Sequence, residues 1–430
     1  MVIYDNLQNK DTTRVTLSEE LTWRGFVNQT TFDDITALDG VSRKLYFGVD
    51  PSGRGMQIGN LAAALMVRHM AAHGHEVYLL VGGATGMIGD PDGKLDERDL
   101  KAVDEIATNK SEIARQYEQV FGGLNFHIVD NYDWFKNINY LDFLRDVGKH
   151  VPMSMMLGRE FIQTRLGDGG NGISYAEFSY SLIQGYDFLH LYREHDVTLQ
   201  VCGADQWGNS IAGVDLIRRI EGGEAHVYSV PLVINKATGR KFGKSEGGAI
   251  WLDPNQTSVY KFYQFWLNVD DEGVIDYMKM YTLLSKDEID KIAAEQAAAP
   301  HTRVAQKRLA WEVTNLVHGE ARTQAAVQAT NVLFGDEAFD ALNTDLLEIL
   351  TNELPTIERV QTIIDGKDTA PTLMISEALV KAQVAKSKGE GRRLLAGGAI
   401  TINGEKVFED TMVSNTTLLK KGKNTFILIV

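Results

Sequence analysis

The chain has 430 residues, a hydrophobic content of 44% and a formal net charge of −15 at pH 7. Such a length predicts about two to three domains with a large buried core. No apolar run reaches the roughly 18 residues of a membrane span, and residues 1–10 lack the pattern of a signal peptide. Cys202 is the only cysteine, which excludes an intrachain disulfide, and the ten histidines show no zinc-ligand spacing. We therefore expect a cytoplasmic protein without a membrane segment or a dedicated metal site.

The charge is unevenly distributed along the chain. A net charge of −15 argues against nucleic-acid binding over the whole surface, because phosphate binding needs clustered lysine and arginine. Residues 372–430, however, hold nine Lys or Arg and five acidic residues, so this segment carries +4 and the rest of the chain −19. The C-terminal segment is therefore the part that we expect to contact nucleic acid.

The first half of the chain alternates short apolar strands with amphipathic helices. Strands are expected at 44–49, 77–81 and 199–201, and helices at 57–72 and 208–219. This alternation predicts an α/β fold over residues 1–235, with a doubly wound, Rossmann-like parallel sheet. Ligands bind beyond the carboxyl ends of the strands in such a sheet, so the polar residues after each strand are the candidate site.

Four segments follow. Residues 236–257 indicate a mobile loop and connection, and 258–335 a helical domain with helices at 259–267, 286–299 and 304–317. The weakly patterned, acidic stretch 336–371 contains Pro355 and Gly366 and indicates a linker. Residues 372–430 combine helix signals with an Asn403-Gly404 turn, which predicts a small α+β domain.

The first polar cluster spans residues 46–60. Tyr46, Gly48 and Asp50 share one face of their strand, and Gly48 allows a ligand to approach the backbone. Gln57 and Asn60 are three residues apart and lie on the same side of the next helical turn. The alternative interpretation is an ordinary tight turn, with Asn60 capping the helix and Gln57 solvated.

The second cluster is a glycine-rich loop at 81–91. It contains Asp90, and Lys94 and Arg98 follow at four-residue intervals. Asp90 can pair with an ammonium group of a ligand, and the two cations can pair with phosphate. Most lysines and arginines are only solvated surface charges, so this cluster is weak evidence by itself.

The third cluster lies on one face of a predicted helix. Tyr180, Gln184 and Asp187 are at positions i, i+4 and i+7. A polar face on a surface helix is the ordinary interpretation. This face, however, combines a phenol, an amide and a carboxylate without lysine or arginine, which is unlike a typical solvated stripe and indicates a binding surface.

Two more clusters follow the strand at 199–201. Asp205 and Gln206 lie between two glycines, and Asp205 is either a ligand group or the N-cap of the next helix. The segment 241–245, with the sequence KFGKS, is a basic loop in which nearby glycines allow movement. Its two lysines can pair with anionic groups of a ligand, although a basic loop of five residues is common and is weak evidence by itself.

In this order, the motifs resemble the ATP site of the class I aminoacyl-tRNA synthetases, and most closely the tyrosyl-tRNA synthetases of bacterial type. The resemblance covers the chain from about residue 20 to the C-terminus. It implies a Rossmann-like catalytic domain, an α-helical anticodon-side domain, and a C-terminal RNA-binding fold shared with a small-subunit ribosomal protein. The implied substrates are ATP, L-tyrosine and tRNA(Tyr), and the implied assembly is a homodimer.

The resemblance also implies a role for each cluster. Tyr46 and Asp187 take the phenolic hydroxyl of tyrosine. The other tyrosine-binding residues are Tyr180, Gln184 and Asp90, for the amino group, and Gln206, for the carboxylate. The ATP-binding residues are Gly48, Asp50, Ser52, Gly59, Gly203, Asp205 and Lys244. The residues that act on the pyrophosphate are Lys94, Arg98, Lys241, Lys244 and Ser245, and the residues that contact tRNA are Lys386, Lys388, Arg392 and Arg393.

The largest departure from the family pattern is at Gln57 and Asn60. The family usually carries two histidines there, which donate hydrogen bonds to the ATP phosphates in the transition state. Gln and Asn keep a neutral N–H donor at each position. Losing one preorganised donor typically costs about 3–4 kcal/mol of transition-state stabilisation, so two retained donors favour a working enzyme.

The implied reaction needs no general base, because the tyrosine carboxylate is already an anion that can attack the α-phosphate of ATP. We expect catalysis by positioning and charge stabilisation, with Mg²⁺ on the departing pyrophosphate. Two other interpretations stay open. A catalytically weakened paralogue that binds RNA is compatible with Gln57 and Asn60. A synthetase for another aromatic amino acid, such as tryptophan, would share the ATP site but is not expected to keep Tyr46 with Asp187.

Overall fold

The computed structural model describes residues 15–91, 101–158, 160–167, 171–245, 248–361, 363–364, 367–368 and 370–430. For residues 155, 160, 161, 244, 245, 363, 364, 367 and 368 it describes the backbone alone. The chain divides into two compact units, a larger one of Met1–Ser258 with Phe265–Val317 and a smaller one of Val259–Gln264 with His318–Val430.

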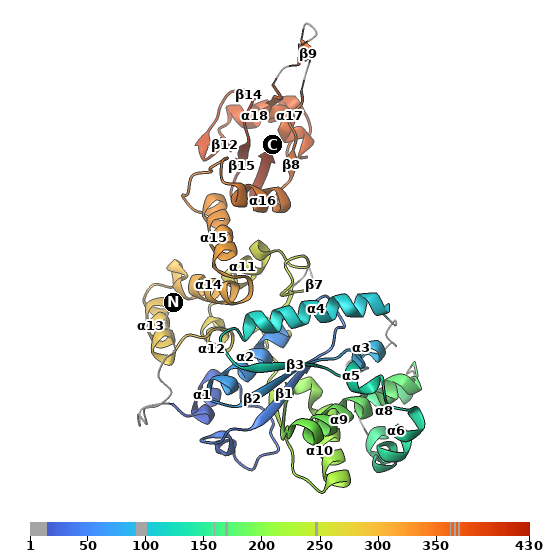
Figure 1. Cartoon of the computed structure of the whole chain (residues 1–430). Coiled ribbons are helices and arrows are strands. Elements are labelled where there is room, and N and C mark those ends of the chain that lie inside the picture. Colours follow the sequence, from blue (N-terminus) through green and yellow to red (C-terminus); the bar gives the residue numbers. More distant parts are fainter. Residues whose placement is uncertain are drawn as a thin grey trace. The chain divides into compact units, whose positions relative to one another are not determined.

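The larger unit is built on a five-stranded parallel sheet in the order β3-β2-β1-β4-β5 (Figure 1). The strands are β1 (Lys44–Val49), β2 (Glu76–Val81), β3 (Phe126–Asp130), β4 (Leu199–Gly203) and β5 (His226–Val230). The chain proceeds outward from β1 to β3 and then returns to β4 on the other side of β1. This is the strand order of a doubly wound, Rossmann-like sheet, so the predicted fold class is confirmed.

Helices cover both faces of this sheet. α2 (Ile58–Ala72) and α4 (Val103–Val120) lie on one face, and α9 (Tyr175–His195) and α10 (Trp207–Glu221) on the other (Figure 1). Side chains alternate along β1, so Phe47 meets Tyr117 of α4 whereas Tyr46 meets Phe188 of α9, at ring-centroid distances of 6.3 and 5.2 Å. Burial of both faces explains why the strands are continuous apolar runs.

The helices predicted at 259–267, 286–299 and 304–317 are confirmed. They correspond to α11 (Val259–Leu267), which crosses the boundary between the two units, α13 (Lys286–Ala298) and α14 (Val304–His318). Their signals are local: α13 begins with a capping box in which the side chains of Ser285 and Glu288 each accept from the other's backbone N–H. None of the helices in the described ranges is long and apolar enough to cross a membrane.

The larger unit contains further short elements. They are α1 (Leu17–Arg24), η1 (Ile35–Leu38), α3 (Thr85–Ile88), α5 (Tyr132–Phe135), α6 (Tyr140–Asp146), η2 (Gly148–His150), α7 (Met153–Leu157), α8 (Glu160–Leu166), η3 (Ala204–Gln206), β6 (Lys244–Ser245), β7 (Gly248–Ala249), α12 (Val274–Tyr281) and η4 (Pro300–Thr302).

The smaller unit has a second sheet in the order β13-β12-β15-β16-β8. α17 (Ile375–Lys381) and α18 (Lys388–Ala396) pack on one face, and α15 (Glu320–Phe334) and α16 (Thr344–Glu353) on the other. The strands of this unit are β8 (Thr356–Ile357), β9 (Ile363–Ile364), β10 (Lys367–Asp368), β11 (Leu373–Met374), β12 (Ile400–Ile402), β13 (Glu405–Lys406), β14 (Met412–Val413), β15 (Thr417–Lys421) and β16 (Thr425–Ile429). The predicted turn between β12 and β13 has φ values of 48° at Asn403 and 94° at Gly404, as a tight hairpin requires.

Four elements of this unit, α16, β8, β9 and β10, lie within the stretch 336–371, which was predicted to be a linker. α16 buries Leu346 and Leu350 completely, and β8 pairs in parallel with β16 near the C-terminus. The sequence signals of β8 and α16 are weak because both elements are short: β8 has two residues and α16 has ten. The five-part division of the chain stays a prediction.

Candidate active site

A cleft of about 660 Å³ opens in the larger unit beyond the carboxyl ends of β1 and β4, where the strand order reverses. Doubly wound sheets bind their ligands at this position. Fifteen of the residues predicted from the sequence line this cleft: Tyr46, Gly48, Asp50, Ser52, Gln57, Gly59, Asn60, Asp90, Tyr180, Gln184, Asp187, Gly203, Asp205, Gln206 and Lys241. The fold therefore brings together clusters that are far apart in the sequence.

The other predicted catalytic residues are in less well-described segments. Lys94 and Arg98 lie outside the described residues, and only the backbone of Lys244 and Ser245 is described. These two residues form β6, which pairs with β7. Beyond β7, the N–H of Leu252 donates to the carbonyl of Met56 at 2.9 Å. The basic loop is therefore connected at this end to the segment that precedes α2.

Asp187 of α9 lines the cleft although only 2% of its surface is exposed. Its two carboxylate oxygens accept hydrogen bonds from Asn131 Nδ2 and Trp134 Nε1, each at 3.0 Å. Burial raises the pKa of Asp187 well above its usual value, while the two hydrogen bonds act in the opposite direction. The two donors hold the carboxyl group in one orientation, and its oxygens keep lone pairs for a ligand.

Three buried polar atoms in the lining have no hydrogen-bond partner among the described residues. They are the hydroxyl oxygen of Tyr46, Oε1 of Gln184 and Oε1 of Gln200. An unpaired buried polar atom costs about 1–3 kcal/mol. Three such atoms around one cleft indicate that a polar ligand supplies their partners.

Gln200 is a lining residue that the sequence analysis missed. It is 3% exposed and pairs in register with Tyr46 across β1 and β4. A glutamine inside an otherwise apolar strand is the signal that could have identified it, because a buried amide needs hydrogen-bond partners.

A chain of hydrogen bonds connects Asp187 to Asp50 and Tyr180. Asn131 Nδ2 also donates to Thr85 Oγ1 at 3.0 Å, and the Thr85 hydroxyl donates to Asp50 Oδ1 at 2.6 Å. Asp50 Oδ2 accepts from the Tyr180 hydroxyl at 2.6 Å. Burial and the nearby carboxylates raise the pKa of Tyr180 well above its usual value, so its hydroxyl stays a hydrogen-bond donor.

Thr85, Asn131 and Trp134 were also missed from the sequence. Asn131 directly follows β3, so it lies at the same carboxyl edge of the sheet as the predicted clusters. The strand β3 is not among the strands expected from the sequence. Recognising the apolar residues at 126, 128 and 129 as a strand would have placed Asn131 and its neighbours at the site.

Asp205 and Gln206 make different contacts. Gln206 Nε2 donates to Asp90 Oδ2, and Gln206 Oε1 accepts from Asn209 Nδ2 at 3.2 Å. Asp205 is not the N-cap of α10, which is Gln206, so the alternative interpretation of Asp205 does not hold. It lies 3.3 Å from Lys241 Nζ, and both side chains are about half exposed, at 48% and 45%. Such an exposed pair is weak, which leaves both groups available to a ligand.

Gln57 and Asn60 lie at the N-terminus of α2. Gln57 is the N-cap of α2, and its backbone N–H donates to Asn60 Oδ1 at 3.0 Å. Asn60 therefore caps the helix, and its Nδ2 group is still a donor. Both side chains line the cleft. A Cβ atom at Gly59, between them, would have no neighbour within 4 Å, which leaves open surface for a flat ring.

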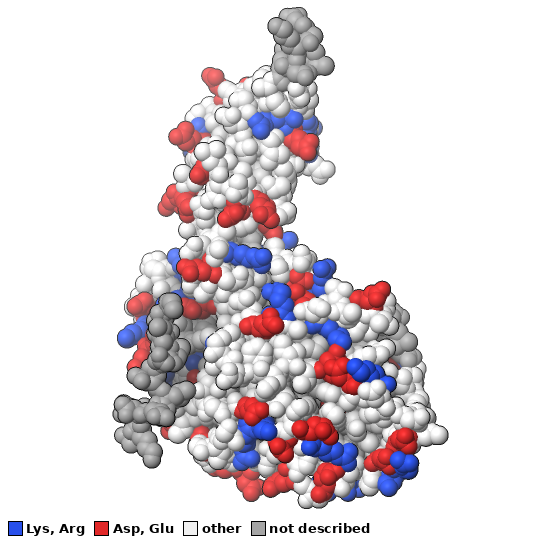
Figure 2. All heavy atoms as spheres, viewed as in Figure 1, with Lys and Arg blue, Asp and Glu red and all other residues white. Residues whose placement is uncertain are grey.

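The cations predicted to contact tRNA are exposed on α18 or just before it, in the smaller unit. Lys388 pairs with Glu377 at 2.8 Å and Arg392 with Asp410 at 3.0 Å. Lys386 and Arg393 form no ion pair within the described part of the chain. Figure 2 shows basic and acidic side chains interspersed on the visible face of this unit. Exposed pairs of this kind are weak, so all four cations remain available to a ligand.

Comparison with known proteins identifies the class of protein. Residues 40–335 match the family described as class I tRNA synthetases (W and Y), and residues 362–429 match the C-terminal domain of tyrosine–tRNA ligases. The Rossmann-like sheet and its cleft are therefore those of a class I aminoacyl-tRNA synthetase.

Relatives that match almost the whole chain identify the family within this class. The tyrosine–tRNA ligase of Bacteroides fragilis is 43% identical over 96% of this chain and 99% of its own length, and that of Latilactobacillus sakei is 42% identical over 95% and 98%. A C-terminally truncated mitochondrial tyrosyl-tRNA synthetase of Aspergillus nidulans has a similar solved structure, with a TM-score of 0.68 and 28% identity over 75% of this chain and 95% of that one. The chain belongs to the tyrosine–tRNA ligase family, which confirms the family predicted from the motifs.

Proposed function

We propose that the cleft activates L-tyrosine with ATP, forming tyrosyl-adenylate and pyrophosphate, and then transfers tyrosine to the 3′-terminal adenosine of tRNA(Tyr). The observation that carries this proposal is the buried Asp187 carboxyl group beside the unpartnered hydroxyl of Tyr46 in one cleft. The phenolic hydroxyl of the substrate can donate to the Asp187 carboxylate and accept from the Tyr46 hydroxyl. Phenylalanine offers neither a donor nor an acceptor there, so the buried Tyr46 hydroxyl would stay unpaired, and the resulting desolvation cost disfavours phenylalanine.

The amino and carboxylate groups of the substrate are assigned to other polar residues that line the cleft. Tyr180, Gln184 and Asp90 take the ammonium group, and the unpartnered Oε1 of Gln184 supports this assignment. Gln206 orients the substrate carboxylate. The hydrogen bond between Gln206 and Asp90 supports a joint role, because it holds their side chains next to each other.

ATP is assigned to the glycine-lined part of the cleft. Gly48, Ser52 and Gly59 permit close approach of the nucleotide, and Asp205 beyond Gly203 is suited to hydrogen bonds from the ribose. The tyrosine carboxylate attacks the α-phosphate, and pyrophosphate leaves. Gln57 and Asn60 donate to the phosphates in the transition state. Lys94, Arg98, Lys241, Lys244 and Ser245 neutralise the charge that builds on the pyrophosphate.

Further components of the proposal concern the metal, the location and the assembly. Mg²⁺ enters bound to the phosphates of ATP, since it prefers phosphate and water oxygens to an all-protein cage. The enzyme works as a cytoplasmic homodimer, and the smaller unit holds the tRNA. The charge of −19 before residue 372 supports the last point, because it repels phosphate from most of the chain.

The proposal is tested by ATP–pyrophosphate exchange with each standard amino acid in turn. We expect exchange with tyrosine and none above background with phenylalanine or tryptophan. Exchange that depends on tryptophan would instead identify the other specificity of this synthetase class. Absence of exchange with every amino acid would contradict the proposal and favour the weakened RNA-binding paralogue.

A further inference from the structure

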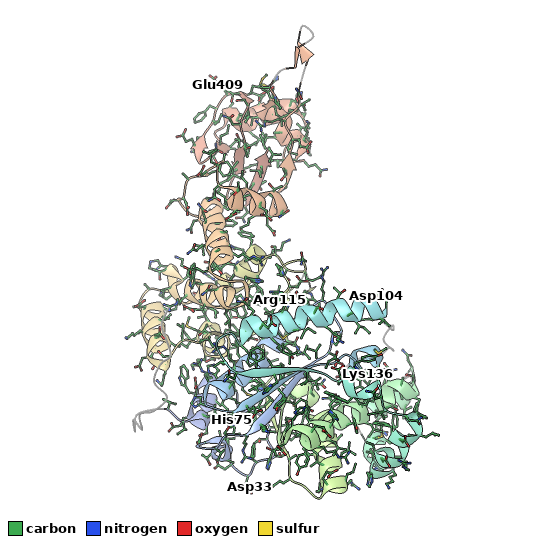
Figure 3. The ribbon with its side chains drawn as sticks, in the orientation of Figure 1. Asp33, His75, Asp104, Arg115, Lys136 and Glu409 are labelled. Atoms are coloured by element: carbon green, nitrogen blue, oxygen red, sulfur yellow. The ribbon has the colours of Figure 1, made fainter. Side chains whose placement is uncertain are left out.

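The helix α4 carries two buried amide side chains that the proposed chemistry does not use. Asn109 and Gln116 are 3% and 2% exposed and belong to the same buried stripe as the apolar residues Ile106 and Ile113. They are seven residues apart, so they lie on one face of the helix. Figure 3 marks the length of α4 by Asp104 near its start and Arg115, the neighbour of Gln116. Two amides in an apolar stripe require specific partners.

The partner of Gln116 is the loop that leads into α2. Gln116 Oε1 accepts a hydrogen bond from the backbone N–H of Met56 at 2.6 Å, and both groups are buried. Its Nε2 group donates to Glu112 at 2.9 Å, which fixes the orientation of the amide. The neighbouring Gly55 has φ of 96°, and a Cβ atom there would lie 2.4 Å from Gln116 Nε2. The loop and this side chain are therefore in close contact.

Asn109 holds the other end of the same loop. Its Nδ2 group donates to the backbone carbonyl of Pro51 at 3.1 Å in a buried position. Just beyond the Met56 end of the loop, the N–H of Ile58 donates to the carbonyl of Ile250, in the segment after β7, at 3.2 Å. The loop between Pro51 and Met56 is thus attached at both ends to α4, and Gln57 follows it directly.

We propose that Asn109 and Gln116 are positioning residues that hold the loop at 51–56 in the geometry in which Gln57 and Asn60 meet the ATP phosphates. Apolar side chains would fill the same space, but they would leave the Met56 N–H and the Pro51 carbonyl unpaired. The loop would then shift to satisfy them elsewhere. A displacement of about 1 Å at a positioned donor can slow a reaction by about 100-fold. This inference rests on the proposed tyrosine activation and adds α4 to the ATP site.

The test replaces each amide by an apolar side chain of similar size, in Gln116→Met and Asn109→Leu. We expect tyrosine-dependent ATP–pyrophosphate exchange at saturating substrates to fall by about 10- to 100-fold in each variant. The dissociation constant for tyrosine, measured by equilibrium dialysis without ATP, should stay within about twofold of wild type, because Tyr46 and Asp187 do not contact α4 through these amides. Glu118→Gln, on the exposed face of the same helix, is the matched control and should exchange at the wild-type rate.

The outcomes separate this inference from the proposed function. Wild-type protein without tyrosine-dependent exchange would refute the proposed function itself. Active wild type with folded variants that exchange at the same rate would refute only the positioning role. Tyrosine affinity that falls by the same factor as the exchange rate would also refute it, since it indicates general disruption. If Gln116→Met does not fold, Asn109→Leu decides by the same criteria; if neither folds, the amides are structural and the inference is rejected.

Discussion

Asp187 depends on donors from a distant part of the chain, the segment at 131–134 that follows β3. Trp134 makes two contacts at once. Its Nε1 group donates to Asp187, and its ring stacks on His190 with a centroid distance of 4.4 Å. The orientation of the proposed specificity residue is therefore set by a side chain outside the predicted clusters.

Replacing Trp134 by phenylalanine separates these contacts, because the ring is kept while the N–H donor is lost. We expect kcat/KM for tyrosine to fall by about 10-fold, as the loss of one hydrogen bond to a buried carboxyl group implies. Selectivity over phenylalanine should fall as well, whereas the KM for ATP should not change. Exchange kinetics with both amino acids measure these values. Unchanged selectivity would mean that Trp134 does not control the geometry of Asp187.

Asn60 allows helix capping and catalysis to be separated by one substitution. Asn60→Asp keeps an oxygen that can accept from the Gln57 N–H, and a carboxylate is favourable in the first turn of a helix. It removes the Nδ2 donor and places a negative charge near the phosphates. We expect exchange to fall by at least about 100-fold. The midpoint of unfolding, measured by circular dichroism, should stay equal or rise, and exchange close to wild type would show that Asn60 only caps α2.

At the scale of elements, α1 is connected to α2 by a partly buried cluster of titratable side chains. Glu20 accepts from Arg24 Nε at 2.9 Å and contacts His69 Nδ1 at 3.1 Å and His73 Nε2 at 2.7 Å. The guanidinium of Arg24 also donates to the backbone carbonyls of Lys279, Thr282 and Leu284 at the end of α12. One hydrogen-bonded cluster therefore attaches α1 to two other helices of the larger unit.

The cluster predicts a pH dependence of stability. Burial acts to raise the pKa of Glu20, but hydrogen bonds from His69, His73 and Arg24 outweigh it and hold the pKa well below its usual value of 4.5. A carboxylate with a lowered folded-state pKa stabilises the fold above its unfolded pKa, and this contribution is lost as the pH falls below that value. Burial also lowers the pKa of His69, which adds to the loss of stability in acid.

We expect Glu20→Gln to lower the free energy of unfolding at pH 7 by about 1–3 kcal/mol, because the partners of the carboxylate lose a charged acceptor. The difference from wild type should narrow as the pH falls below about 4.5. Urea unfolding at several pH values measures both effects. Glu19→Gln is the matched control, since Gln also serves in the capping box with Thr16. A difference that stayed constant with pH would contradict this account of the cluster.

At the scale of the whole molecule, the smaller unit is one folding unit. Its sheet packs Leu418 and Leu428 against Leu333 of α15 and Leu350 of α16. Removing residues 372–430 would therefore expose half of a core in addition to removing the basic segment. Substitution of charges is a better test of RNA binding than truncation.

Lys386→Ala combined with Arg393→Ala removes two exposed cations without disturbing that core. We expect the KM for tRNA in aminoacylation to rise by about 10-fold or more, with a weaker dependence on salt, because fewer phosphate contacts release fewer counterions. Tyrosine-dependent exchange should not change. The charge-conserving pair Lys386→Arg with Arg393→Lys is the control and should charge tRNA nearly as wild type does. Unimpaired charging by the alanine variant would place the tRNA contacts elsewhere.

The sequence by itself determined the features that depend on neighbouring residues. The α/β class, the helices α11, α13 and α14, the hairpin turn at Asn403 and the order of the site motifs all follow from local periodicity and from capping and turn chemistry. Tertiary structure decided which of these motifs meet and what holds them. The contacts of Asn131 with Asp187 and of Gln116 with Met56 join residues 56 and 60 positions apart. Such contacts depend on strand order and helix docking, which arise from burial over the whole sheet and leave no local pattern in the chain.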